Sequence, residues 1–199
     1  MINVLLFSHD RPELIVESID SVFDQSYKDW VIWILDDDSS FDLEQLITRY
    51  DTSKIITVNM IRDGEAEWYE YVNLVIEQVP RGEFITYLCD DDVLSPDWFS
   101  DAMSDGDYHI IGGRVGSFGE RSQDAPVGAF DIGSFLIKSD CYWDCDIYWS
   151  AGYRGEKHSY DVGYIARMLT KHRDTDIDVI DSMSMRRRYH EGSLSRGMQ

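Results

Sequence analysis

Acidic residues gather at three points of the N-terminal half, at Asp10, at Asp36 to Asp38 and at Asp90 to Asp92. Neighbouring carboxylates repel one another, and burying a carboxylate is costly unless a cation lies beside it. Hard divalent ions such as Mg²⁺ and Mn²⁺ prefer oxygen ligands and usually complete their coordination with substrate phosphates. The alternative interpretation is that these aspartates are solvated turn and helix-capping residues, a role that suits Asp well.

The elements that must position these residues can be predicted from the hydrophobic pattern. Apolar runs at 4–7, 30–35, 55–61 and 84–88 predict strands, and helical patterns with one apolar face separate them, the third over about 65–79. Such alternation is typical of an α/β fold with a mostly parallel central sheet and helices on both faces. Ligands of these folds bind at the carboxyl ends of the strands, where all three acidic points lie.

Beyond Asp92 the pattern is less regular. We expect a short helix with Pro96 in its first turn and a second helix whose apolar face includes Val162 and Leu169. The remaining segments are predicted as strands at 108–112, 129–137, 177–180 and 183–189, with a polar loop at 114–128 and helices at 96–103 and 160–172. No linker or internal repeat is visible, so we expect one domain over residues 1–199.

The charge is strongly asymmetric. The chain carries 38 acidic and 18 basic side chains, and residues 1–110 hold 25 of the acidic ones but only 6 of the basic ones. A net charge of −20 repels nucleic acid, anionic membranes and phosphorylated substrates unless a cation intervenes. The three cysteines lack zinc-site spacing and are expected to be reduced thiols. With no apolar run of about 18 residues, the sequence predicts a cytoplasmic protein without a transmembrane segment, of bacterial or viral origin.

Several segments carry a resemblance to a known family. The N-terminal ones are Ser-His-Asp-Arg-Pro at 8–12, Ser-Ile-Asp-Ser-Val at 18–22 with Gln-Ser-Tyr at 25–27, and Leu-Asp-Asp-Asp-Ser at 35–39. Ser21 and Gln25 of the second segment make a Ser-x-x-x-Gln motif. Asn73, the strand at 82–88 and Asp-Asp-Asp-Val at 90–93 follow at a matching spacing. Together they resemble family 2 glycosyltransferases of the glycosyltransferase-A fold, of the compact inverting type. The likeness covers nearly the whole chain.

The resemblance implies a division of labour within the domain. Residues 1–110 would bind the nucleotide sugar and the metal, and residues 111–199 would bind the acceptor and carry the catalytic base. The nucleotide-binding residues implied by the family are Phe7, Ser8, Arg11, Asp36, Asp37, Asn73 and Asp90. Asp91, Asp92 and His190 would bind Mn²⁺ or Mg²⁺. The pattern leaves open whether Asp91 alone or an Asp90/Asp92 pair provides the carboxylate ligands. The chain differs from the family at two positions. Members of the family often carry Arg at the position of Val72, and the first aspartate of their metal-binding motif corresponds to Cys89.

The C-terminal part resembles the family in two further segments. Tyr160-Asp161, followed by Arg167, matches the start of a helix in the family whose aspartate is the catalytic base. The resemblance therefore implies that Asp161 is the base. The alternative is that its carboxylate only stabilises the start of its helix. Tyr-His-Glu-Gly-Ser-Leu-Ser at 189–195 resembles a loop whose His often binds the metal. The remaining residues implied at the diphosphate or acceptor are Arg187, Arg188, Ser193 and Trp149.

The sequence therefore predicts an inverting, metal-dependent enzyme that moves a sugar from a nucleoside-diphosphate sugar, favouring UDP, to an acceptor hydroxyl. A nucleotidyltransferase and a non-catalytic module that binds sugar nucleotides or carbohydrate are the alternatives. The acceptor is left open between glycan, lipid-linked glycan, protein and small molecule. A DNA base is disfavoured because the net charge opposes duplex binding.

Overall fold

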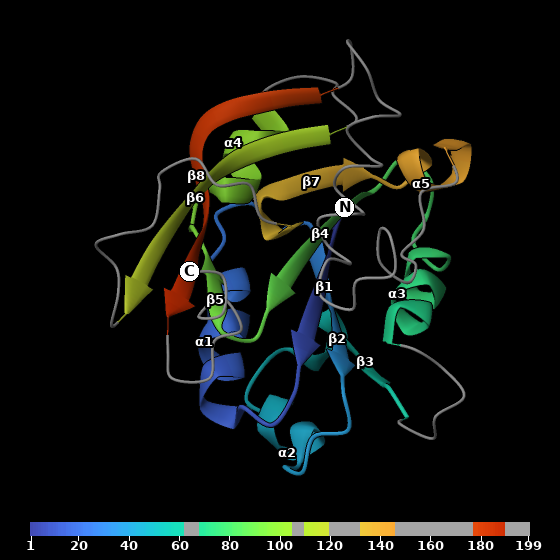
Figure 1. Cartoon of the computed structure of the whole chain (residues 1–199), viewed down its shortest axis with the longest axis vertical. Helices are drawn as coiled ribbons and strands as arrows, with labels where there is room; N and C mark the ends of the chain where they lie inside the picture. The colour runs from blue at the N-terminus through green and yellow to red at the C-terminus, as the bar shows by residue number, and fades with distance from the viewer. Residues whose placement is uncertain (62–67, 105–109, 120–131, 146–176, 190–199) are drawn as a thin grey trace, which may run out of the picture.

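Four parallel strands form the N-terminal part of the sheet. β1 (Ile2–Ser8), β2 (Trp30–Asp36), β3 (Ile55–Asn59) and β4 (Phe84–Cys89) are hydrogen-bonded in the order β3-β2-β1-β4. The computed structural model describes residues 1–61, 68–104, 110–119, 132–145 and 177–189. The four strands run in the same direction, so their carboxyl ends lie along one edge of the sheet (Figure 1). This is the arrangement that the apolar runs predict.

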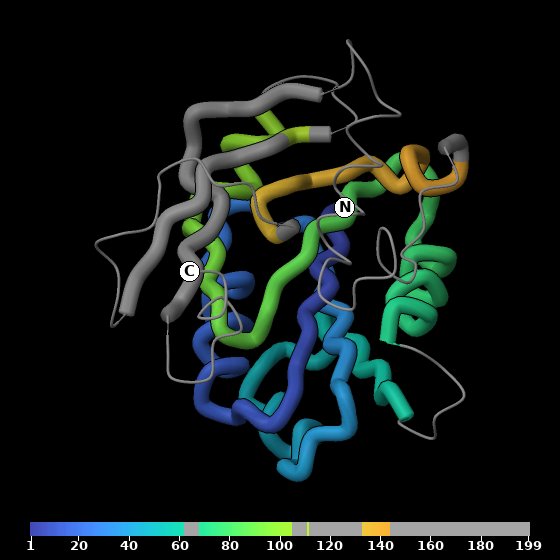
Figure 2. Tube along the Cα trace, in the orientation of Figure 1, coloured from blue at the N-terminus to red at the C-terminus, as the bar shows by residue number. Residues whose placement is uncertain are grey.

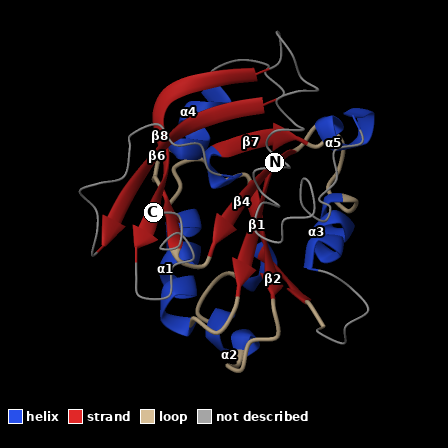
Figure 3. Cartoon of the chain, in the orientation of Figure 1, coloured by secondary structure: helices blue, strands red, loops and turns tan. Residues whose placement is uncertain are grey.

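Helices cover both faces of these strands (Figure 3). One face packs against α1 (Pro12–Phe23), α2 (Leu43–Ile47) and α4 (Trp98–Ser104), and the other against α3 (Trp68–Ile76) and α5 (Asp140–Cys145). On α1, Ile15, Ile19 and Val22 are fully buried, and each such side chain contributes about 1.5–3 kcal/mol. Within the described ranges, no helix has the length and apolar character needed to cross a lipid bilayer.

Local signals explain where these helices begin. Pro12 occupies the first turn of α1, where its missing N–H removes no helical hydrogen bond. The side chain of Asp42 caps α2 by accepting a 2.9 Å hydrogen bond from the Gln45 N–H, as the sequence predicts. The N-terminal chain from β1 to α4 can be followed continuously in blue to green in Figure 2, apart from residues 62–67.

The second part of the sheet has mixed strand directions. β5 (Asp92–Leu94), β6 (Ile110–Gly119), β7 (Phe135–Lys138) and β8 (Ile177–Tyr189) continue the order from β4 as β7-β6-β8-β5. β7 is antiparallel to β4 and β6, β8 is parallel to β6, and β5 is antiparallel to β8. Two short 3-10 turns, η1 (Thr52–Lys54) and η2 (Ile132–Ser134), precede β3 and β7. The fold class is confirmed as α/β with a mostly parallel central sheet.

Three sequence predictions need correction in this second part. Of the strand expected at 129–137, residues 132–134 form the η2 turn, and β7 begins at Phe135. The segment 114–119 was expected in a polar loop, but it lies in β6, which pairs with β8 through a register shift at Gly112 and Arg114. The two strands expected at 177–180 and 183–189 form one continuous strand, β8. The differences in β6 and β8 have the same cause. The backbones of these two strands form hydrogen bonds with each other, and this pairing does not depend on the hydrophobic pattern of their side chains. The helix expected at 160–172 lies outside the described residues.

Candidate active site

The ends of β1, β2 and β4 are joined by backbone hydrogen bonds. The Asp37 N–H donates to the Ser8 carbonyl at 2.9 Å, and the Asp90 N–H donates to the Phe7 carbonyl at 3.0 Å. The exposed His9 ring adds a third link, because its Nδ1 lies 2.7 Å from the Asp37 carbonyl oxygen. The convergence of the three acidic points at one edge of the sheet is therefore a property of the fold. The Phe7 and Ser8 carbonyls, which the family resemblance placed in the nucleotide pocket, accept these bonds.

The loops after β1 and β2 are interlocked. Asp36, 7% exposed, accepts a hydrogen bond of 2.5 Å from the Ser39 hydroxyl, and the Ser39 oxygen accepts from the Asp10 N–H at 3.0 Å. The Asp10 carboxylate accepts from the Ser40 N–H at 2.6 Å. Asp10 and Asp38 have positive φ angles of 50° and 54°, which Asp tolerates better than most residues. Asp36 thus shapes the turn that follows β2.

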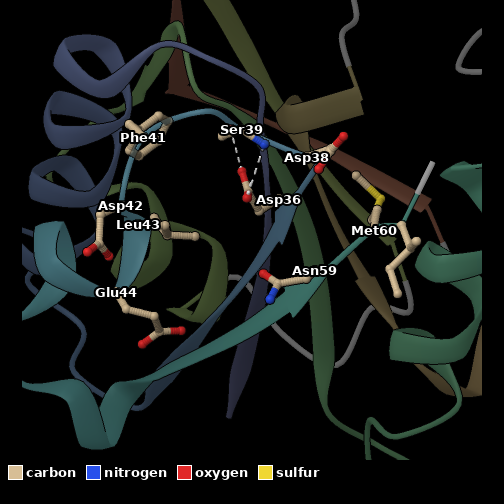
Figure 4. Close-up of a pocket in the computed structure, with 10 residues that line it drawn as sticks. Asp36, Asp38, Ser39, Phe41, Asp42, Leu43, Glu44, Asn59 and Met60 are labelled. Carbon is tan, nitrogen blue, oxygen red and sulfur yellow. Dashed lines mark hydrogen bonds between the residues drawn. The ribbon is translucent and has the colours of Figure 1, made fainter. Parts of the chain in front are cut away.

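A pocket of about 310 Å³ opens beside this turn, between α2 and the end of β3 (Figure 4). Four carboxylates are among its lining residues, which include Asp36, Asp38, Asp42, Glu44, Asn59 and Met60. No Lys, Arg or His belongs to the described lining. Phosphate groups would be repelled here, whereas the acidic turn after β4 has the Arg11 guanidinium beside it, so that turn is the better candidate for binding a diphosphate.

Arg11 fixes the acidic turn between β4 and β5. Its Nη1 lies 2.8 Å from a carboxylate oxygen of Asp90 and 3.3 Å from one of Asp91. The other Asp90 oxygen accepts from the His9 N–H at 3.0 Å. Arg11 was expected to contact nucleotide, and in the structure its guanidinium binds the two aspartates. Burial raises the pKa of Asp90, while the His9 N–H and Arg11 oppose that rise.

Asp91 and Asp92 form a potential metal site with Cys89. One ligand atom of each, carboxylate oxygen or thiol sulfur, lies within 4.8 Å of the others. Metal–oxygen bonds of about 2.0–2.2 Å and metal–sulfur bonds of about 2.3 Å put two ligands of one ion at most roughly 4.6 Å apart, so these residues fit a single divalent ion after a small adjustment. Asp90 faces Arg11 and is not in this group.

Helix α1 holds the backbone of the same turn. The Ser18 hydroxyl oxygen lies 2.6 Å from the Asp92 carbonyl oxygen, 2.9 Å from that of Asp90 and 3.3 Å from that of Cys89. The Ser21 hydroxyl accepts from the Leu94 N–H at 3.0 Å, and the Gln25 side chain donates to the Ser95 carbonyl at 2.7 Å. The Ser-x-x-x-Gln motif therefore positions the acidic turn.

Strand β8 brings the C-terminal basic segment beside the acidic turn. In the antiparallel pairing of β5 with β8, Asp92 stands opposite Arg187 and Val93 opposite Arg186. Arg188 pairs with Phe118 of β6. Residues almost a hundred positions apart are thus neighbours in the backbone. His190 and Ser193, which follow β8, lie outside the described residues, as do Trp149 and Asp161.

The other described candidates lie on the α3 side of the sheet. The half-buried Phe7 ring stacks on Tyr87, with centroids 6.2 Å apart, and meets Trp68 edge-on at 6.0 Å. Asn73 is half-buried in α3. Sequence reasoning missed Cys89 as a potential ligand, Ser18 as a backbone support and His9 as a link between loops. The family's aspartate at position 89 was the available signal for Cys89, whereas nothing in the sequence singled out His9.

Comparisons with known proteins agree with this geometry. The model of glycosyl transferase family 2 matches residues 4–192. Protein CgeD of Bacillus subtilis (strain 168) is 27% identical over 104 residues, which are 50% of this chain and 24% of CgeD. A crystal structure of S. aureus TarS superposes with a TM-score of 0.75 at 14% identity, covering 94% of this chain and 36% of TarS. S. aureus TarS 1-349 in complex with UDP-GlcNAc gives 0.75 at 15% identity, covering 96% and 59%. The chain thus spans about a quarter of CgeD and between a third and three fifths of these TarS chains.

Proposed function

Because the chain belongs to glycosyl transferase family 2, we propose that it transfers a sugar from a nucleoside-diphosphate sugar, with UDP as the nucleotide, to an acceptor hydroxyl. The observation that carries the proposal is the β4–β5 turn. There Asp91, Asp92 and Cys89 present converging ligand atoms next to Arg11, at the edge of the sheet where the ends of β1 and β2 also lie. The S. aureus TarS structure with UDP-GlcNAc, which has the same fold, supports the choice of UDP.

The proposed donor site has two parts along this edge. Asp37 and Asn73 would contact the base and ribose, beside the Phe7 ring, and the diphosphate would lie at the β4–β5 turn. Adjacent strands are about 4.8 Å apart, so the ends of β2 and β4 are separated by roughly 10 Å, a span that a nucleoside diphosphate can bridge. Mn²⁺ or Mg²⁺ held by Asp91 and Asp92, with His190, would neutralise the charge of the diphosphate leaving group. Arg187 or Arg188 is proposed to face the same diphosphate, since adjacent residues of a strand such as β8 point to opposite faces of the sheet.

The chemical step is proposed to proceed with inversion. The acceptor hydroxyl loses its proton to the Asp161 carboxylate as its oxygen bonds to the anomeric carbon. The bond from that carbon to the diphosphate oxygen breaks at the same time, and the nucleoside diphosphate leaves. One base and no separate nucleophile give a single displacement, which inverts the anomeric configuration. We assign acceptor binding to residues 111–199, with Trp149 and Ser193 as contacts, and we place the reaction in the cytoplasm.

A panel of nucleoside-diphosphate sugars tests the proposal. Each donor is incubated with the protein and candidate glycan acceptors, with and without Mn²⁺, and released nucleoside diphosphate and pyrophosphate are measured. We expect UDP from a UDP-sugar, and more of it with metal. Pyrophosphate release would instead identify a nucleotidyltransferase, and donor binding without release of either product would identify a binding module.

A further inference from the structure

Position 89 departs from the family's metal motif, and the structure places its thiol among the metal ligands. Cys89 is the last residue of β4, half-buried and not in a disulfide. Its sulfur lies within 4.8 Å of carboxylate oxygens of both Asp91 and Asp92. A serine-bound turn keeps these three residues together, because the Ser18 hydroxyl contacts the carbonyls of Cys89 and Asp92.

We propose that Cys89 is a metal ligand, and that it makes this site select borderline and soft divalent ions over Mg²⁺. The inference deepens the proposed function, because it rests on the same metal site. Thiolate ligands favour ions such as Co²⁺, Zn²⁺ and Cd²⁺, whereas Mg²⁺ requires oxygen. Replacing one carboxylate of an all-oxygen site by a thiolate therefore lowers the Mg²⁺ affinity relative to these ions.

The strand geometry supports this role. Cys89 pairs in register with Phe7 of β1, and side chains that alternate along β4 put Tyr87 and Cys89 on one face of the sheet. Tyr87 is fully buried on that face, whereas Cys89, one step nearer the carboxyl end, is half-buried. The thiol thus stands at the border between the core and the edge where the carboxylates lie. On binding a metal the thiol would release its proton to solvent, since only the thiolate coordinates.

Cobalt titration of the full chain tests this directly. Co²⁺ bound by a thiolate gives a sulfur-to-metal charge-transfer absorption, which a site made only of oxygen ligands lacks. We expect this band in the unmodified protein, its loss in Cys89→Ser, and its retention in Cys141→Ala, because Cys141 lies on α5 and is buried in the core cluster on the α3 side of the sheet. Competition with Cd²⁺ and Mg²⁺ measures the selectivity. Cys89→Ser should lose Cd²⁺ affinity by roughly tenfold or more, the range found when the surroundings of a metal ligand are removed.

A variant that restores the family's carboxylate at position 89 distinguishes the loss of a metal ligand from general damage to the fold. Cys89→Asp supplies the family's carboxylate, so it should bind Mg²⁺ more tightly than the unmodified protein while binding Cd²⁺ more weakly. A Cd²⁺/Mg²⁺ affinity ratio that is the same in the unmodified protein and in both Cys89 variants would overturn the inference. A chain that shows the cobalt–thiolate band but transfers no sugar overturns the proposed function alone. Sugar transfer by a chain whose band is absent overturns the role of Cys89 alone.

Discussion

The two parts of the sheet are built in different ways. In the parallel part, β1 pairs with β2 and β4 in an unbroken register, and β1, β2 and β3 are each followed along the chain by a helix that packs on the sheet. In the mixed part, β6 and β8 are brought together from positions more than 60 residues apart, with register shifts at Gly112 and Arg114. The parallel part is specified by local patterns, whereas the mixed part depends on pairing between distant segments.

The acidic turn is the point where the two parts meet. Cys89 ends a strand of the parallel part, and Asp92 begins β5, which pairs only with β8 in the described sheet. Arg11 binds the carboxylates of this turn and Ser18 contacts its backbone carbonyls, both from the parallel part. The mixed part contributes the backbone pairing of β5 with β8, in which Asp92 stands opposite Arg187. We infer that binding of the nucleotide and metal depends on the first part, and that the chemical step depends on the second.

The largest effect should come from Asp161, the proposed catalytic base. Replacing Asp161 by Asn preserves the size of the side chain but removes the proposed base, so the rate of transfer should fall roughly 10²- to 10⁴-fold. UDP affinity should change little, since the base contacts the acceptor and not the nucleotide. Asp140→Asn, at the start of α5, is the matched control and should keep the normal rate. Near-normal transfer by Asp161→Asn would favour the helix-stabilising role instead.

Arg11→Gln should give the next largest effect, on the parallel part. It leaves the Asp90 carboxylate, 4% exposed, without its ion pair, which should lower the free energy of unfolding by about 1–3 kcal/mol. Thermal or urea unfolding measures it. Arg81→Gln is the control, because Arg81 meets Asp140 at 3.9 Å with 61% of its side chain exposed, and such pairs contribute about 0–1 kcal/mol. Equal losses in the two variants would show that Arg11 does not support the turn.

Ser18→Ala should have a smaller effect on stability but loosen the acidic turn. The hydroxyl proton can be donated to one of the neighbouring carbonyls at a time, so its removal should cost about 1 kcal/mol. Mn²⁺-dependent UDP binding should weaken as well, because the Asp92 backbone loses its contact with α1. Ser26→Ala removes an exposed hydroxyl pair with Ser100 and should change neither quantity. Unweakened UDP binding in Ser18→Ala would show that the contacts of Ser18 do not support the proposed site.

The smallest effect concerns pH and lies away from the site. Burial and the 2.9 Å hydrogen bond to Asp20 raise the pKa of Tyr50 above its usual value of 10.0. The folded state therefore retains the phenol proton when the unfolded chain releases it, so this contribution to stability is present below pH 10 and declines as pH rises further. Tyr50→Phe should lose about 1 kcal/mol at neutral pH and show a shallower alkaline decline. Unfolding curves between neutral and alkaline pH check this, and parallel declines would contradict it.

The parallel part and its acidic edge could be predicted from the sequence because the signals are local. Apolar runs gave β1 to β4, and the order of strands and helices placed Asp37 and Asp91 at one edge. β5 could not be predicted, since three residues carry no periodicity and the strand exists through its pairing with β8. The Gly- and Ser-containing end of β6 was mistaken for a loop for the same reason. The ion pairs of Arg11 with Asp90 and Asp91 could not be predicted, because sequence order does not reveal which acid a guanidinium reaches.

Titration calorimetry of UDP into the protein with Mn²⁺ tests the central claim most directly. The account predicts that Asp91→Asn, in the turn that carries the proposed metal site, loses Mn²⁺-dependent UDP affinity by roughly tenfold or more while its unfolding midpoint stays close to that of the unmodified protein. Asp97→Asn, which changes an exposed carboxylate just beyond β5, should bind UDP normally. Equal UDP affinity in Asp91→Asn and the unmodified protein, with Mn²⁺ present, would contradict the account.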